Sequence, residues 1–167
     1  MNAPHPPPPR PATYQDVLDA PAHMVAEIVG GHLHLHPRPA SPHTRAHSAL
    51  LGELHGPFDR GRGGPGGWWV LTEPELHLGP DVLVPDVAGW RRDRMPVYPD
   101  APWFDLAPDW ACEVLSPSTR KVDLTGKRDI YAREGAWTLL AALKDGEPVA
   151  VAPFEAVEWP LSALWPD

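Results

Sequence analysis

Proline limits where helices and strands can run in this chain, because its ring fixes φ and removes a main-chain hydrogen-bond donor. The 167 residues include 24 prolines, whereas an average chain of this length holds about 8. Many of them lie in an N-terminal tail, residues 1–12, or in loops. We therefore expect a disordered or polyproline-like tail, followed by a single compact domain over residues 13–167 with stiff connections.

The first part of that domain carries signals for a helix, a hairpin and a second helix. A short helix is expected over 14–19. Two apolar runs flank Gly30-Gly31, and this arrangement predicts a hairpin over 26–35. A second helix follows, and either Ser41 or Thr44 can cap its N-terminus.

The rest of the domain alternates apolar runs with charged or proline-rich connections. The runs predict strands over 68–73, 75–78, 82–90, 110–115 and 137–143, and a helix over 123–134 that is closed by Gly135. This order of elements predicts an α/β fold in which helices pack on a mixed sheet.

Charge and cysteine content exclude some classes of protein. The formal charge of −8 argues against a protein that coats nucleic acid, but a nuclease stays open because a bound divalent metal supplies positive charge. Cys112 is the only cysteine, so the chain has no internal disulfide, and its apolar surroundings indicate a core residue. No run approaches the roughly 20 apolar residues of a membrane span. The N-terminus lacks a hydrophobic signal region, and we expect a cytoplasmic protein.

Two carboxylates stand out within predicted strands. Side chains alternate across a strand, so Asp86 shares a face with apolar residues only: Val82, Val84, Ala88 and Trp90. Glu113 likewise shares its face with Ala111 and Leu115. Burying a carboxylate costs several kcal/mol unless it is paired or binds metal, and a cation between two acids resolves their repulsion. For either acid alone, a solvated strand end or a loop cap is the simpler interpretation; the two together favour a site.

Lys127 is the third candidate. On a helix it lies on or beside an apolar stripe that includes Ile130 and Tyr131. The simpler interpretation is an exposed ion pair with Asp123 at i, i+4. In the functional interpretation, its ammonium points at the carboxylates, where it can stabilise an oxyanion or orient water.

Other polar residues are weaker candidates. His32, His34 and His36 alternate along one strand, but same-face positions diverge and no acid completes a metal site, so a polar outer face is favoured. His43 has two interpretations, helix capping and substrate contact, of which capping is favoured. Arg91 and Arg92 follow the Asp86 strand. A basic cluster of this kind is usually a solvated loop, but its place makes it the best candidate for phosphate contact.

Several motifs together resemble the Uma-type family of putative restriction endonucleases, within the PD-(D/E)XK nuclease superfamily. They are Val84-Pro85-Asp86-Val87-Ala88, the run Cys112-Glu113-Val114-Leu115-Ser116-Pro117-Ser118-Thr119, then Asp123, Lys127 and Tyr131-Ala132-Arg133-Glu134-Gly135. The resemblance spans roughly residues 14–165 and implies a restriction-endonuclease-like sheet flanked by helices, with an N-terminal hairpin.

The resemblance also implies a site and a reaction. Asp86, Glu113 and the Val114 carbonyl would hold Mg²⁺ (or Mn²⁺), with Glu27 as an auxiliary acid, Lys127 as the catalytic lysine, and Glu75 as a source of further charge around them. The reaction would be hydrolysis of phosphodiester bonds in nucleic acid, with DNA the expected substrate and no membrane partner. The preference for DNA or RNA and the oligomeric state, monomer or homodimer, stay open.

Two departures from the family pattern bear on this expectation. The lysine usual two residues after the glutamate is Leu115 here, so the chemistry would depend on Lys127. On the order of twenty residues are absent after Gly135, where relatives have a further strand and hairpin. The alternatives are therefore an inactive relative that binds nucleic acid or protein, or a shortened copy without function.

Overall fold

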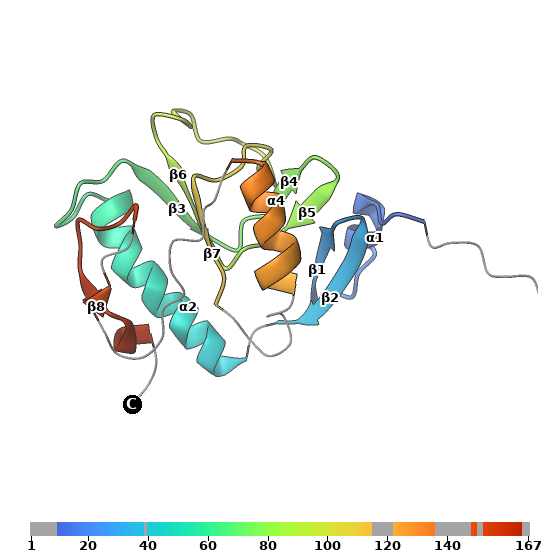
Figure 1. Cartoon of the computed structure of the whole chain (residues 1–167), viewed down its shortest axis with the longest axis horizontal. Helices are drawn as coiled ribbons and strands as arrows, with labels where there is room; N and C mark the ends of the chain where they lie inside the picture. The colour runs from blue at the N-terminus through green and yellow to red at the C-terminus, as the bar shows by residue number, and fades with distance from the viewer. Residues whose placement is uncertain (1–9, 39, 115–121, 136–147, 150–151, 165–167) are drawn as a thin grey trace, which may run out of the picture.

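The computed structural model describes residues 10–38, 40–114, 122–135, 148–149 and 152–164 (Figure 1). Most of the proline-rich tail and the predicted strand over 137–143 lie outside these residues. The described residues form an α/β fold of antiparallel sheets flanked by helices, which confirms the predicted fold class. No helix among them is long and apolar enough to cross a bilayer.

Two sheets carry most of the strands. The first has the order β2-β1-β5-β4, with β1 at Met24–Val29, β2 at His32–Pro37, β4 at Leu76–Leu78 and β5 at Asp81–Leu83. The second has the order β3-β6-β7, with β3 at Trp68–Thr72, β6 at Val87–Arg91 and β7 at Trp110–Cys112. A short pair, β8 at Pro148–Val149 and β9 at Trp159–Pro160, lies near the C-terminus. The hairpin at Gly30-Gly31 joins β1 to β2 as predicted, and both glycines have positive φ.

The predicted strand over 82–90 is wrong in one respect, because the chain leaves one sheet and enters the other within it. β5 ends at Leu83 and β6 begins at Val87. Pro85 stands between them, where its missing N–H cannot continue a ladder. Asp86 therefore lies in a link between two sheets, and it does not share a strand face with Val82 and Trp90.

The predicted strand over 110–115 ends earlier than expected. β7 stops at Cys112, so Glu113 and Val114 follow the strand. Both candidate carboxylates thus occupy strand ends, which is the position that the simpler interpretation gave them. Unlike a solvated strand end, however, each of the two side chains is only 14% exposed.

The helices follow the predicted order. The first is α1 at Tyr14–Leu18, and the second is α2 at Ser41–Leu54, which continues into the π-helical turn η1 at His55–Asp59. The π-helical turn η2 at Asp123–Lys127 leads into α4 at Arg128–Arg133, and the short 3₁₀ helix η3 spans Leu161–Leu164. The caps predicted for α2 are wrong: Ala40 is the N-cap, and the Thr44 hydroxyl donates to the Ala40 carbonyl. Gly135, with φ of 69°, ends α4 as predicted.

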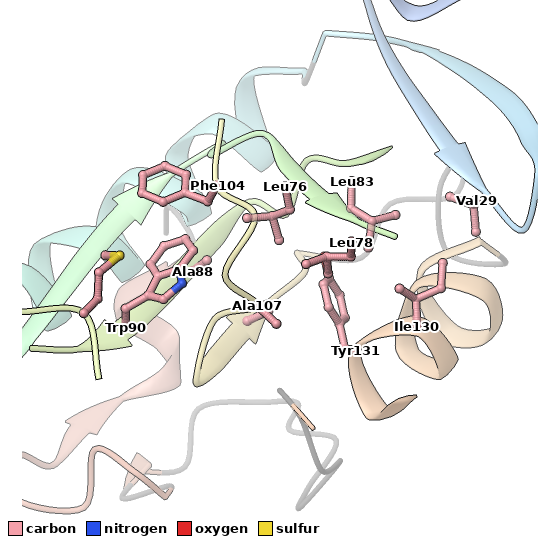
Figure 2. Close-up of a cluster of buried hydrophobic side chains, with 12 residues drawn as sticks. Val29, Leu76, Leu78, Leu83, Ala88, Trp90, Phe104, Ala107, Ile130 and Tyr131 are labelled. Carbon is pink, nitrogen blue, oxygen red and sulfur yellow. The ribbon is translucent and has the colours of Figure 1, made fainter. Parts of the chain in front are cut away.

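The β3-β6-β7 sheet separates two hydrophobic clusters. On one side, Ala88 and Trp90 of β6 pack with residues of α4 and of the other sheet, among them Tyr131 and Leu83 (Figure 2). On the opposite side, Val87 packs with the buried stripe of α2, which includes Leu50. Alternate residues of β6 thus enter different cores, and this sheet lies between α2 and α4 (Figure 1).

The buried position of Leu83 makes it a test of the first cluster. Its relative exposure is 0%, so Leu83→Ala should lower the free energy of unfolding by about 2–5 kcal/mol through lost burial and a residual cavity. Leu18→Ala is the control, because Leu18 is 59% exposed and its truncation should change stability by less than about 0.5 kcal/mol. Thermal or urea unfolding measures both. Equal effects of the two substitutions would contradict this packing.

A buried cluster of carboxylates around Lys127

Lys127 lies at the centre of a charged cluster between the two sheets and α4. Its side chain is only 3% exposed, and its Nζ lies 2.8 Å from Glu27 Oε1 and 3.3 Å from both Glu113 Oε1 and Asp123 Oδ1. The Val84 carbonyl accepts a further, longer contact at 3.5 Å. The exposed i, i+4 pair that the simpler interpretation offered is therefore wrong: the pair with Asp123 exists, but it is buried among other acids.

Glu27 reaches Lys127 from β1 and is fixed at both carboxylate oxygens. Its Oε1 also accepts the Val84 N–H at 2.6 Å, and its Oε2 lies 3.0 Å from His36 Nε2 on the neighbouring strand β2. The side chain is 2% exposed. Such a buried charge persists only with partners of this kind, and Glu27 has them from three different segments of the chain.

Asp86 and Glu113 come together because of the strand register. β6 and β7 are antiparallel with Val87 opposite Cys112, so Asp86 precedes one strand where Glu113 follows the other. The main chain links the two segments directly, since Asp86 Oδ2 accepts the Val114 N–H at 2.7 Å. Asp86 and Glu113 therefore lie at the same end of this ladder.

Glu113 is the most perturbed acid of the cluster. Its Oε1 accepts hydrogen bonds from Lys127 and, at 3.2 Å, from the Tyr131 hydroxyl. Burial is the main reason that the pKa of Glu113 rises to about 8. The positive charge of Lys127 lowers this pKa, while the negative charges of Asp123, Glu27 and Asp86 raise it further. Without an added cation, Glu113 therefore holds a proton near neutral pH.

Asp86 is perturbed in the same direction. Burial raises its pKa, while the Val114 N–H and the positive charges of neighbouring groups lower it in part. His43, from the first turn of α2, places Nε2 3.3 Å from Asp86 Oδ2. The imidazole therefore faces the carboxylate and does not cap the helix, which corrects the favoured interpretation of His43.

The cluster carries more negative than positive charge when all its acids are ionised. The cluster holds four carboxylates and one ammonium: Glu27, Glu113 and Asp123 contact Lys127, and Asp86 lies near enough for the charge of Lys127 to act on it. Burial acts to lower the pKa of Lys127, but Glu113, Glu27 and Asp123 outweigh it and raise that pKa, so the ammonium stays protonated. The remaining negative charge favours a proton or a metal cation beside Glu113 and Asp86.

The donor atoms fit a hydrated divalent cation better than a closed protein cage. Asp86 Oδ1 and Glu113 Oε2 accept no hydrogen bond from any described residue. Across the described ranges, no three Asp, Glu, His or Cys side chains converge to hold a metal. Mg²⁺ commonly binds through one or two carboxylates and retains several waters, so two acids and a main-chain carbonyl are a sufficient set.

The π-helical turn η2 brings Lys127 to the centre of the carboxylate cluster. Turns of this kind insert an extra residue into a helix and occur often at functional sites. Gly126 lies against β1 so closely that an added Cβ would stand 2.5 Å from Val29 Cγ1. The absence of a side chain at Gly126 therefore allows η2 to approach the strand that carries Glu27.

Three other candidates lie apart from the cluster. Glu75 accepts the Tyr14 hydroxyl at 2.8 Å and contacts His77, so its described partners are elsewhere. Arg91 and Arg92 are at the far end of β6 from Asp86, roughly 16 Å along the strand. Arg92 donates to the Trp68 carbonyl and to Asp59, which ties it into the fold.

Three residues join the cluster that the sequence pattern did not single out. The sequence predicts Asp123 as a surface ion-pair partner, Tyr131 as part of an apolar stripe, and His36 as part of a polar outer face. The register of the hairpin places His36 on the same face as Glu27, because Val25 is opposite His36 and Glu27 is opposite His34. The alternation of the histidines was visible in the sequence, but the partner across the hairpin depends on a register that only the structure gives.

Comparisons with known proteins agree with this fold. The family model Uma2, described as putative restriction endonuclease, matches residues 11–153. A solved structure described as a putative nuclease belonging to DUF820 from Anabaena variabilis superposes with a TM-score of 0.72 at 18% identity, covering 92% of this chain and 97% of that one. At this identity the likeness concerns the fold alone. A search of curated proteins finds no match.

The raised pKa of Glu113 predicts a pH-dependent stability difference. The folded protein holds a proton on Glu113 up to about pH 8, whereas the unfolded chain releases it near 4.5, so the free energy of unfolding falls as pH rises through this window. Glu113→Gln removes the effect. In metal-free buffer, its Tm should equal that of the wild type near pH 5 and exceed it by about 3–8 °C at pH 8. A difference that does not grow with pH would contradict the prediction, and Glu75→Gln is the control.

The contact between Gly126 and Val29 predicts a specific coupling. Gly126→Ala should destabilise the protein by about 1–3 kcal/mol through overpacking. In the double variant with Val29→Ala, the loss should be smaller than the sum of the two single losses. Gly52→Ala is the matched control, since an added Cβ there meets nothing within 4 Å. Additive losses in unfolding experiments would contradict the proposed contact.

Proposed function

The chain belongs to the Uma2 family of putative restriction endonucleases, whose model matches most of its length, and on this basis we propose that it is a metal-dependent endonuclease that hydrolyses phosphodiester bonds in DNA. The observation that carries the proposal is the convergence of Asp86, Glu113 and Lys127 at one end of the β6–β7 ladder. Two carboxylates and one ammonium supply what a hydrolytic phosphate site needs, a cation site and a fixed positive charge.

Asp86 and Glu113 are the proposed ligands of Mg²⁺ or Mn²⁺, together with the Val114 carbonyl. The donor set is all oxygen, which suits these hard cations. When bound, the metal would polarise the phosphate and lower the pKa of an attacking water. The raised pKa values of both acids support this assignment, because carboxylates that resist ionisation alone gain most from a neighbouring cation.

Lys127 is the proposed catalytic lysine. Its ammonium stays protonated and lies 3.3 Å from Glu113, so it is placed to orient water or to neutralise charge that develops on the phosphate. Glu27 and Asp123 hold the ammonium from the side of β1 and from its own helix turn. Glu27 thereby serves as the auxiliary acid that the family resemblance implies.

The proposed partner is nucleic acid, with duplex DNA as the substrate. Each chain contributes one such cluster, so cutting both strands in one event would need two copies, and a homodimer is part of the proposal. We place the activity in the cytoplasm. The half-buried Cys112, whose thiol pKa is raised to about 12 mainly by desolvation, takes no part in the reaction.

A plasmid assay tests the proposed function. Purified protein should nick supercoiled plasmid in the presence of Mg²⁺ or Mn²⁺ and not with EDTA. Asp86→Asn, Glu113→Gln and Lys127→Met should each lower the rate by at least about 100-fold, because each removes an interaction with the reacting phosphate or the metal.

The control for this assay is Glu75→Gln, because Glu75 is hydrogen-bonded away from the cluster. It should cleave like the wild type, and thermal unfolding should show all four variants to be folded. The endonuclease proposal fails if the wild type cleaves neither plasmid nor single-stranded DNA with either metal. It fails equally if the cluster variants cleave at the wild-type rate, which would indicate a contaminating nuclease.

A further inference from the structure

The His36 side chain is largely buried and contacts the cluster, but it has no role in the proposed chemistry. It lies on β2, and its ring is 19% exposed while its Nε2 is 3.0 Å from Glu27 Oε2. An ionised carboxylate only accepts hydrogen bonds, so the imidazole donates through Nε2–H. Among the described residues, His36 is the partner of Glu27 Oε2, whereas Val84 and Lys127 both contact Glu27 Oε1.

We propose that His36 is a positioning residue that fixes the rotation of the Glu27 carboxylate and, through it, the place of the Lys127 ammonium. The proposal rests on the proposed function for its catalytic consequence, but its structural part stands on the contacts alone. His36 closes a chain of contacts from the edge strand β2 through Glu27 to Lys127 and Glu113.

The physical argument concerns the two oxygens of one carboxylate. A Glu carboxylate turns about its terminal bond unless both oxygens are held. Without His36, Oε2 would lose its described donor, and a buried oxygen without a partner carries the full cost of its desolvation. The carboxylate would then turn toward solvent or exchange its oxygens, which loosens the 2.6 Å bond to Val84 and the 2.8 Å pair with Lys127.

The neighbouring histidine shows that the role is specific to this position. His34 lies directly opposite Glu27 in the ladder and on the same face of the hairpin, yet its side chain makes no hydrogen bond to the described residues. The diagonal neighbour, and not the direct one, therefore holds the carboxylate. His34 is for this reason the matched control.

The test compares His36→Ala, His36→Gln and His34→Ala by two measurements. Gln retains a donor on a side chain of similar reach, so it should restore what Ala removes. In plasmid cleavage, His36→Ala should lower kcat by about 10–100-fold with little change in KM, as is usual when the partner of a site residue is lost. His36→Gln should recover most of the rate, and His34→Ala should match the wild type.

Amide hydrogen exchange decides the structural part without any activity. The Val84 N–H donates to Glu27 Oε1, so it should exchange at least about 10-fold faster in His36→Ala and return toward the wild-type rate in His36→Gln. The Val82 amide, in the strand that pairs with β1, reports on the sheet and should not change.

The outcomes separate the two proposals. Unchanged Val84 exchange in His36→Ala overturns the positioning role, and so does a parallel increase at Val82, which would indicate general loosening of the sheet. If the Val84 amide exchanges faster in His36→Ala as expected, but the wild-type protein cleaves no DNA, the His36 contact is established and the endonuclease proposal is refuted. Faster Val84 exchange with unaltered kcat in an active enzyme would overturn the catalytic consequence.

Discussion

The buried ion pair between Lys127 and Glu27 is the interaction on which the rest of the site depends. It joins β1 to the turn η2, and Glu113 and Asp123 contact the same ammonium. Removing one partner of a buried pair commonly costs 3–5 kcal/mol, because the remaining charge stays uncompensated. A chain that keeps such an arrangement for stability alone would gain as much from apolar residues, and this is why the cluster is better explained by function.

The interruption between β5 and β6 at Pro85 also determines where the groups of the site lie. It divides the segment over 82–90 into β5 and β6, and the register of β6 with β7 then places Asp86 beside Glu113. The same link offers the Val84 amide and carbonyl to Glu27 and Lys127. One proline thus separates two sheets and exposes main-chain groups that the site uses.

The elements of the fold could largely be predicted from the sequence, whereas the exact place of the site residues could not. Turn glycines and apolar periodicity located the hairpin, α2, α4 and most strands, because these signals are local. Strand alternation singled out Asp86 and Glu113, yet both lie beyond strand ends, and it is the register of two distant strands that brings them together. His36 and Tyr131 were missed as members of the cluster for the same reason, since their partners Glu27 and Glu113 lie across a sheet or on another element.

The arrangement of the two sheets has a consequence for how the protein reaches its active form. The groups of the cluster come from regions far apart along the chain, among them β1, the link after β5, the end of β7, and η2. Contacts between residues so distant along the chain form late in folding, after loop-closure entropy has been overcome. A growing or partly folded chain would therefore hold its acids apart and in water, with no means of concentrating charge around a phosphate. The proposed activity would therefore require the completed fold.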